Sequence, residues 1–204
     1  MKILAINGSH RPGKGTAALL GIALEAAAAK GADTVLVELS QLNIGYCAGC
    51  NGCMRKPNCP LQDDMQALTQ RLLEADGIIL GSPAYFSGVT ARLKTFIDRT
   101  RPLHMVDNAL KGKVGGAVAT AGLADCGGES TLAQLYSFFA THEMLAVHPR
   151  PLGPVMGNGV LATQFAGVVD DGQIFWRSVK DDPIGTGFAR QLGEDMAGLI
   201  SRLA

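Results

Sequence analysis

Four cysteines between residues 47 and 59 have the spacing that points most directly to chemistry in this chain. Cys47, Cys50, Cys53 and Cys59 form the pattern C-x2-C-x2-C-x5-C, and Pro60 follows the last of them. Two overlapping C-x2-C steps place three thiolates around one centre, and a more distant cysteine followed by proline closes the site. We therefore predict that these residues bind a 4Fe-4S cluster, a group that can be lost when protein is prepared in air.

Two other interpretations of these thiols stay open. Zinc is one, although structural zinc sites usually combine two separate C-x2-C steps or include histidine, and no histidine lies between residues 11 and 103. Free or redox-active thiols are the other. Five cysteines in 204 residues are too few for a disulfide scaffold, and the N-terminus does not resemble a secretion signal, so we expect a reducing compartment. Cys126 lies far from the other four, and we interpret it as a bystander thiol.

A glycine-rich loop at residues 8–15 could bind an anion. It joins an apolar strand to a helix, and the exposed N–H groups and dipole of a helix N-terminus favour negative charge. Ser9 and Thr16 offer hydroxyls, and Arg11 can contact a phosphate with two N–H groups. The loop matches neither the Walker pattern nor Gly-x-Gly-x-x-Gly. The alternative is an ordinary turn between a strand and a helix.

Two further loops carry residues suited to a flat ligand. Residues 81–88 include the adjacent aromatics Tyr85 and Phe86, which can stack against a ring. Their alternative role is to pack at the edge of the core or in a subunit contact. Residues 120–128 end in two glycines, which allow the backbone to approach a ligand closely. The alternative there is the start of a helix without a ligand.

The elements that must position these loops alternate along the chain. Apolar segments predict five strands, and amphipathic or alanine-rich segments between them predict five helices. Such alternation indicates a parallel sheet with helices on both faces. Ligands of these sheets bind at the carboxyl ends of the strands, where the three loops should meet. The strands are expected at 2–7, 34–39, 77–80, 113–120 and 144–148, and the helices at 16–30, 63–75, 88–101, 129–142 and 184–203.

The chain resembles the NAD(P)H-dependent FMN reductase and multimeric flavodoxin superfamily. Gly-Ser-x-Arg begins at residue 8, Gly-Ser-Pro-x-Tyr-Phe at 81, Leu-Lys-x-Phe-Ile-Asp-Arg at 93 and Gly-Gly-x-Ser-Thr at 127. Together these motifs cover roughly the first 145 residues. Within the superfamily, the cysteine pattern and the Asp-Asp-Met at 63–65 resemble the iron–sulfur flavoproteins of anaerobes. No pattern is identified in residues 149–183.

The resemblance implies an α/β fold and an FMN site. The fold is expected to be one flavodoxin-like domain over residues 1–204, with an open parallel five-stranded sheet of order 2-1-3-4-5, helices on both faces, a cysteine loop at 44–62 and an irregular segment at 149–183. Ser9, Arg11 and Thr16 are implied to bind the FMN phosphate, and residues 83–87 and 120–122 to border the ring. The implied cofactor contacts are Ser9, Arg11, Gly15, Thr16, Pro83, Ala84, Tyr85, Phe86, Ser87, Thr120, Ala121, Gly122, Gly127 and Gly128.

Three functions are compatible with these features, and the first two make the protein an oxidoreductase. The leading hypothesis is an FMN-dependent electron-transfer flavoprotein whose 4Fe-4S cluster couples a one-electron donor such as ferredoxin to flavin chemistry. The second is an NAD(P)H-dependent FMN or quinone reductase with structural or redox-active cysteines. The third is a redox sensor. No catalytic side chain is predicted, since the flavin N5 would carry the chemistry.

Composition limits the kinds of partner that we expect for this protein. The formal net charge is zero and the pI is about 6.9, which gives no indication of nucleic acid binding. No segment approaches the roughly 20 apolar residues of a membrane span, so we expect a cytoplasmic protein. The cysteine loop follows the second strand, at the sheet edge, and should share the flavin's edge of the sheet. We therefore predict a homodimer or homotetramer in which this loop approaches the flavin of another subunit, which light scattering would test.

Overall fold

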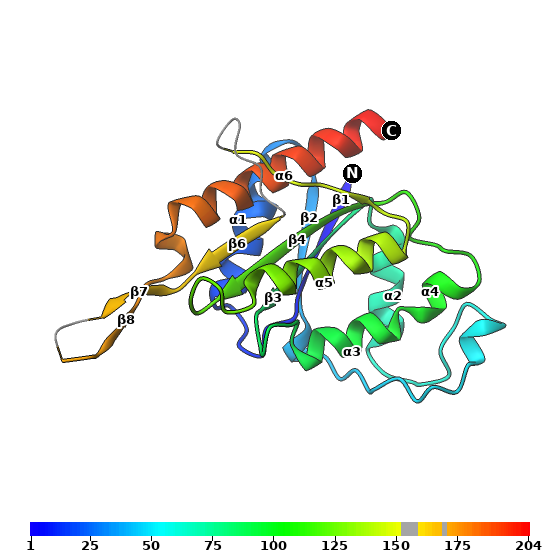
Figure 1. The fold of residues 1–204 in the computed structure, drawn as a ribbon. Helices are drawn as coiled ribbons and strands as arrows, with labels where there is room; N and C mark the ends of the chain where they lie inside the picture. Colours follow the sequence, from blue (N-terminus) through cyan, green and yellow to red (C-terminus); the bar gives the residue numbers. More distant parts are fainter. Residues whose placement is uncertain (152–158, 169–170) are drawn as a thin grey trace.

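A central parallel sheet organises the protein, as the sequence predicts. The computed structural model describes residues 1–151, 159–168 and 171–204. Within these residues the sheet has the order β2-β1-β3-β4-β5, and a sixth strand, β6, pairs with β4 (Figure 1). This confirms the predicted flavodoxin-like strand order. The strands are β1 (Lys2–Asn7), β2 (Asp33–Glu38), β3 (Gly77–Pro83), β4 (Val114–Ala121), β5 (Leu145–Ala146) and β6 (Val160–Thr163).

The fifth position in the sheet is shared by two short strands. β5 pairs with the start of β4, at Val114 and Gly115, whereas β6 pairs with the end of β4, from Val118 to Ala121. Pro149 and Pro151 follow β5, and proline has no N–H to donate to a ladder. The strand predicted at 144–148 is two residues long, the Val147 N–H still donates to the Gly115 carbonyl at 2.8 Å, and the prolines prevent the ladder from continuing along β4. The rest of this position is filled from a segment for which the sequence predicts no element.

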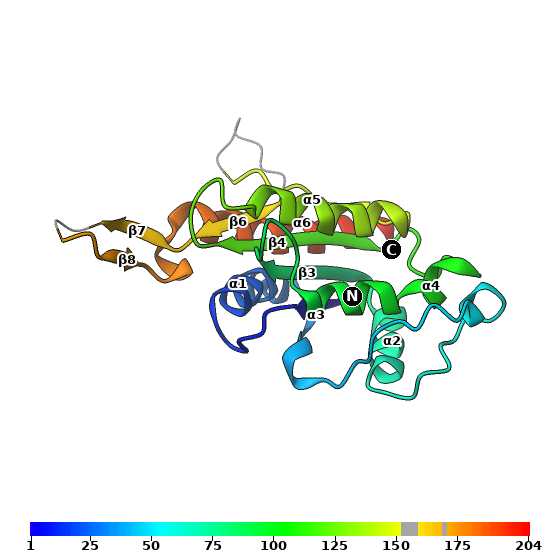
Figure 2. The same cartoon turned by 60° about the horizontal axis from the view of Figure 1, so that its bottom comes forward.

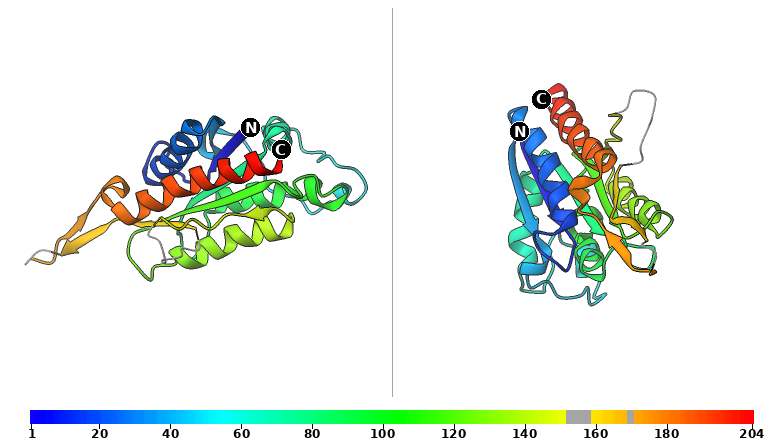
Figure 3. Two further views of the ribbon diagram at one scale, coloured as in Figure 1. Left: turned by 90° about the horizontal axis from the view of Figure 1, so that it is seen from above. Right: turned by 90° about the vertical axis from the view of Figure 1, so that its left-hand side faces the viewer.

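Helices cover both faces of the sheet (Figures 2 and 3). On one face, Ile3 and Ala5 of β1 pack with α1 and α6 in one buried cluster. On the other face, Leu4 and Ile6 pack with α2, α3 and α5 in a second cluster. This burial on both faces explains why β1, β3 and β4 are nearly all apolar. The helices are α1 (Gly15–Ala29), α2 (Met65–Glu74), α3 (Ala91–Arg99), α4 (Arg101–Met105), α5 (Gly128–Thr141) and α6 (Pro183–Leu203).

A β-hairpin projects from the body of the protein. Its antiparallel strands are β7 (Phe165–Val168) and β8 (Ile174–Trp176), and it extends beyond the sheet edge at which β4 ends (Figures 1 and 3). Three 3₁₀ helices complete the described structure, namely η1 (Leu39–Gln41), η2 (Gly52–Met54) and η3 (Val179–Asp181). Residues 149–183, expected to be irregular, thus include β6, the hairpin and η3. None of the helices in the described ranges has both the length and the hydrophobicity to cross a bilayer.

Candidate functional site

The three glycine-rich loops meet at the carboxyl ends of β1, β3 and β4. They surround a hollow of about 80 Å³. Ten of the residues predicted to contact a cofactor line it, namely Ser9, Arg11, Gly15, Thr16, Pro83, Ala84, Tyr85, Thr120, Ala121 and Gly122. We call residues 8–16, 82–88 and 120–128 the rim. The parallel sheet brings these loops together because each follows the end of a neighbouring strand.

Hydrogen bonds connect each loop of the rim to the others. The Thr16 and Thr120 hydroxyls lie 3.0 Å apart, which joins the first loop to the third. The Ala84 N–H donates to the Thr120 carbonyl at 2.7 Å, which joins the second loop to the third. Buried Thr90, at the N-cap of α3, joins the first loop to the second, since its hydroxyl donates to the Gly8 carbonyl at 2.6 Å and its N–H donates to the Ser82 hydroxyl at 3.1 Å. The rim is therefore one connected structure.

The outer part of the rim holds the other four predicted residues, Phe86, Ser87, Gly127 and Gly128. Gly127 has a φ of +83°, and a Cβ there would lie 2.3 Å from the Ser87 Cα, so only glycine fits. The Ser130 hydroxyl donates to the Ser87 carbonyl at 2.7 Å, which fixes the second loop to the start of α5. Phe86 is fully exposed, with a φ of +47°. These residues do not line the hollow but border it.

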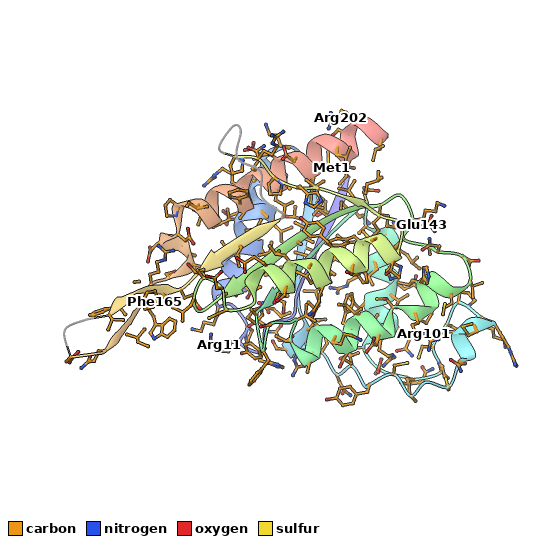
Figure 4. All side chains as sticks on the ribbon, in the orientation of Figure 1. Met1, Arg11, Arg101, Glu143, Phe165 and Arg202 are labelled. Carbon is orange, nitrogen blue, oxygen red and sulfur yellow. The ribbon has the colours of Figure 1, made fainter. Side chains whose placement is uncertain are left out.

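The first loop has the features of an anion site. Lys14, at the N-cap of α1, makes no side-chain capping bond, so the first-turn N–H groups of α1 lack this usual partner within the described structure. Ser9 is buried, and its hydroxyl accepts from the Arg11 N–H at 3.1 Å. From outside, the Glu38 carboxylate accepts from the Gly13 N–H at 3.0 Å and holds the turn in place. Arg11 lies exposed beside the hollow (Figure 4). Free N–H groups, a hydroxyl and a guanidinium together suit a phosphate.

Two residues of the hollow are absent from the sequence-based prediction. Lys14 adds a second cation near Arg11, and Gln164 lines the hollow from the end of β6. The Gln164 N–H donates to the Ala121 carbonyl at 3.1 Å, so β6 delivers this amide to the third loop. Gln164 belongs to the segment without a recognisable pattern, so no local signal indicates it. Lys14 lies within the predicted loop at residues 8–15, so its charge was a usable signal.

Larger hollows lie away from the rim. One of about 680 Å³ lies between α5 and α6, where Tyr136 stacks on His148 with ring centroids 4.4 Å apart. None of the predicted site residues lines this hollow. One of its lining residues, Gly159, directly follows residues 152–158, which lie outside the described ranges. We therefore place the candidate site at the rim, where the polar groups converge.

The four predicted cluster ligands lie on one loop but are not gathered. Cys47 and Cys50 are exposed, Cys59 is half-buried, Cys53 is buried, and all are free thiols. Among the described residues, no three His, Cys, Asp or Glu side chains are close enough to hold a metal ion. The donor type fits an iron–sulfur cluster, whereas the arrangement does not.

The course of the cysteine loop, residues 44–62, differs from the expectation that it shares the flavin's edge of the sheet. It leaves β2 at that edge but then runs beneath α3 to the opposite end of the molecule, where η2 packs against α4 (Figures 1 and 2). The Arg101 side chain donates to Asn51 there at 3.3 Å. The nine residues of α3 rise about 14 Å, so the contact of η2 with α4 lies at the end of α3 remote from Thr90 and the rim. This part of the expectation was wrong.

A buried ion pair explains this course. The Arg99 guanidinium donates to both carboxylate oxygens of Asp63, at 2.6 and 3.0 Å, and to the Gly45 carbonyl at 2.7 Å. The Arg99 and Asp63 side chains are only 1% and 8% exposed. Burial raises the pKa of Asp63, but the bonds from Arg99 and from the Gly45 and Met65 N–H groups outweigh it and hold the pKa below its ordinary value. Arg99 also lies beside Cys59. The two ends of the cysteine loop are thus fixed to the end of α3.

The doubly wound sheet and its strand order define a flavodoxin-like fold. A flavodoxin, WrbA-like protein from Agrobacterium tumefaciens shares this fold with a TM-score of 0.58, at 17% identity over 98% of this chain and 97% of that one.

Sequence comparison then identifies the family. Residues 1–152 match the family described as NADPH-dependent FMN reductase. An iron-sulfur flavoprotein of Methanocaldococcus jannaschii is 38% identical, covering 98% of this chain and 97% of that relative. An iron-sulfur flavoprotein of Archaeoglobus fulgidus is 34% identical, covering 95% and 92%. The chain therefore belongs to the NADPH-dependent FMN reductase family, in its iron–sulfur flavoprotein branch, and is an oxidoreductase. The predicted homo-oligomer stays a prediction.

Proposed function

We propose that the protein is an FMN-dependent electron-transfer flavoprotein that binds FMN at the rim. One observation carries the proposal. The uncapped N-terminus of α1, the Ser9 and Thr16 hydroxyls and the cations of Arg11 and Lys14 converge on one hollow beneath the two loops that present small residues and exposed aromatics. The hollow of about 80 Å³ suits a phosphate-sized group, so a three-ring flavin would lie against the loops above it.

The residues of the chain would bind and orient the cofactor rather than react. FMN supplies one- and two-electron redox chemistry when bound. Ser9, Thr16 and the α1 N-terminus would hold the phosphate by hydrogen bonds, and Arg11 would add a charge-assisted contact. Backbone groups of 83–87 and 120–122 would border the ring, and their mutual hydrogen bonds would keep them in place before binding.

We further propose that Cys47, Cys50, Cys53 and Cys59 bind a 4Fe-4S cluster. The ferredoxin-like spacing supports this assignment, as do the iron-sulfur names of relatives aligned over nearly the whole chain. The loop would have to close to gather the thiols, and metal binding commonly supplies the free energy for such ordering.

The phosphate contact gives the decisive test of the FMN site. Arg11→Ala removes a charge-assisted contact worth about 1.5–3 kcal/mol, so the dissociation constant for FMN should rise about 10- to 100-fold. Riboflavin has no phosphate and should bind the variant and the wild type equally, which makes it the matched control. The measurement is calorimetric titration of flavin-free protein. Equal FMN affinity in both proteins would refute the assignment of Arg11.

A second function has its own support. The family description names NADPH as donor, and the thiols are not gathered in the structure, as expected of an NAD(P)H-dependent FMN or quinone reductase without a cluster. Rates of flavin reduction by NADH, NADPH and reduced ferredoxin separate the two. Faster reduction by ferredoxin that depends on bound iron favours the electron-transfer protein. Reduction by NAD(P)H at the same rate with and without iron favours the reductase.

A further inference from the structure

Trp176 is the single tryptophan of the chain, and it lies at the rim although it belongs to the hairpin. A Cβ on Gly122 would lie 3.5 and 3.7 Å from two carbons of the Trp176 six-membered ring, so the indole lies against the third loop. Gly122 also lines the hollow. Beyond this contact, the Trp176 residue is 59% exposed. An indole with so much free surface beside a proposed ring site can contact a ligand.

The base of the hairpin is fixed to the third loop by hydrogen bonds. The Phe165 N–H donates to the Gly122 carbonyl at 2.8 Å, and Phe165 is the partner of Trp176 across the hairpin. Beside Trp176, the Arg177 N–H donates to the Gln164 carbonyl at 2.7 Å. The Arg177 side chain donates to the Asp182 carboxylate at 3.1 Å, at the start of α6. Trp176 is therefore held next to the rim by the folded body, although the hairpin projects beyond it (Figure 1).

We propose that Trp176 is a flavin-contacting residue, whose indole packs against the isoalloxazine ring from the Gly122 side. This inference rests on the proposed FMN site and adds a contact from outside the three loops and outside the matched residues 1–152. The chemistry is aromatic contact between two flat π systems, which prefer offset or edge-to-face packing. Such a contact recognises the ring and is indifferent to the phosphate. It is therefore separable from the Arg11 contact.

The neighbouring residue supplies a matched control. Phe175 is 53% exposed and lies on the same strand, but successive side chains of a strand point to opposite faces. Phe175→Leu thus removes an aromatic ring of the hairpin without changing the side that faces Gly122. Trp176→Phe keeps a flat ring at the contact position. Trp176→Leu removes the flat ring but keeps an apolar side chain.

The experiment titrates flavin-free wild type and the three variants with FMN and with riboflavin. Trp176→Leu should weaken binding of both flavins by the same factor, about three- to tenfold, whereas Phe175→Leu should not change either affinity. Trp176→Phe should retain most of the wild-type affinity. Bound flavin should fluoresce more brightly in Trp176→Leu, because an indole in contact with a flavin quenches its emission by electron transfer.

The outcomes separate this inference from the FMN proposal. If wild type binds neither flavin, the FMN proposal fails and the role of Trp176 fails with it. If wild type binds FMN but Trp176→Leu binds both flavins as tightly, only the role of Trp176 is overturned. Equal losses in Trp176→Leu and Phe175→Leu would also overturn it, since the hairpin fold rather than the indole would then be responsible.

Discussion

The rim and the cysteine loop follow strands of the same sheet, yet they are constructed differently. The rim has its three loops joined to one another by hydrogen bonds, including the Thr16–Thr120 contact at 3.0 Å. The cysteine loop is fixed at both ends by Arg99, while Cys47 and Cys50 between them are exposed. Adjacent parallel strands place the rim loops side by side without any ligand. The cysteine loop follows the edge strand β2 and has no second loop to define its shape.

This difference indicates two separable modules. The shape of the rim is set by the folded sheet, so its site should exist in the flavin-free protein. The shape of the cysteine loop should instead depend on what its thiols bind, since metal binding and local folding are coupled. Changes in one region should therefore leave the other intact. Three sets of variants test how each region is held in place, in order of decreasing effect.

The largest effect is expected from a cluster ligand. Cys50→Ala removes one of the four proposed thiolates, so one iron of the cluster would lack a protein ligand. Bound iron and acid-labile sulfide should therefore be lost. FMN affinity should stay at the wild-type value. The measurement is iron, sulfide and FMN per chain, in protein made and kept without oxygen.

Cys126 provides the control for this variant, since it is exposed and lies on the third rim loop, away from the cysteine loop. Cys126→Ala should retain full iron. Stoichiometric zinc without sulfide in the wild type would contradict the cluster assignment. Loss of FMN together with iron in Cys50→Ala would contradict the independence of the two modules.

The next effect concerns the buried ion pair at the base of the cysteine loop. Arg99→Met leaves the Asp63 carboxylate buried without its partner, which should lower the free energy of unfolding by about 3–5 kcal/mol. Lys94→Met is the control on the same helix. It breaks the Lys94–Asp98 pair, whose side chains are 57% and 46% exposed, and should cost only about 0.3–0.5 kcal/mol. Urea denaturation measures both values, and similar losses would contradict the role given to Arg99.

The pH dependence of stability gives a second readout of the same pair. The pKa of Asp63 is lowered in the folded state from an ordinary value of 3.8. Its contribution to stability is therefore fully present above that ordinary value and is lost as the pH falls below it, through the lowered folded-state pKa. Between about pH 5 and pH 3, the unfolding free energy of the wild type should fall more steeply than that of Arg99→Met.

The sequence was sufficient to predict the order of strands in the sheet, because the local apolar pattern agrees with the burial of the strands. β1, β3 and β4 are apolar runs buried on both faces, whereas in the edge strand β2 only Val37 is buried. Each of these four strands is followed by a helix that packs back onto the sheet. The fifth position did not follow from the sequence. β6 is four residues long, and what makes it a strand is its pairing with the end of β4, a tertiary contact that no short pattern encodes.

The candidate site divides in the same way. Ser9, Arg11 and Thr16 were predictable because a single strand–loop–helix unit carries them all. Gln164 and Trp176 reach the rim only because Thr163 pairs with Ala121. The course of the cysteine loop depends on Arg99 and Asp63, which are 36 residues apart, so the cysteine spacing could indicate the ligands but not where they lie.

The smallest expected effect lies at the border of the rim, where a hydroxyl from α5 contacts the second and third loops. Ser130 lies in the first turn of α5 and donates to the Ser87 carbonyl at 2.7 Å, with the Gly127 carbonyl 3.0 Å away. Ser130→Ala should lower the unfolding free energy by about 1 kcal/mol and weaken riboflavin binding by less than about tenfold, because the sheet still holds both loops at their bases. Iron content should not change.

Ser137, two turns further along α5, is the matched control for this small effect. Its hydroxyl donates to the Ala133 carbonyl of the same helix at 3.0 Å, a bond that joins no two loops. Ser137→Ala should leave riboflavin affinity unchanged, and stability should stay the same or rise slightly, because alanine has the higher helix propensity. If Ser130→Ala and Ser137→Ala behave alike, the sheet alone determines the shape of the rim. If Ser130→Ala weakens riboflavin binding while Ser137→Ala does not, the hydrogen bonds between the loops contribute to the shape of the rim. Those bonds are what distinguish the rim from the cysteine loop.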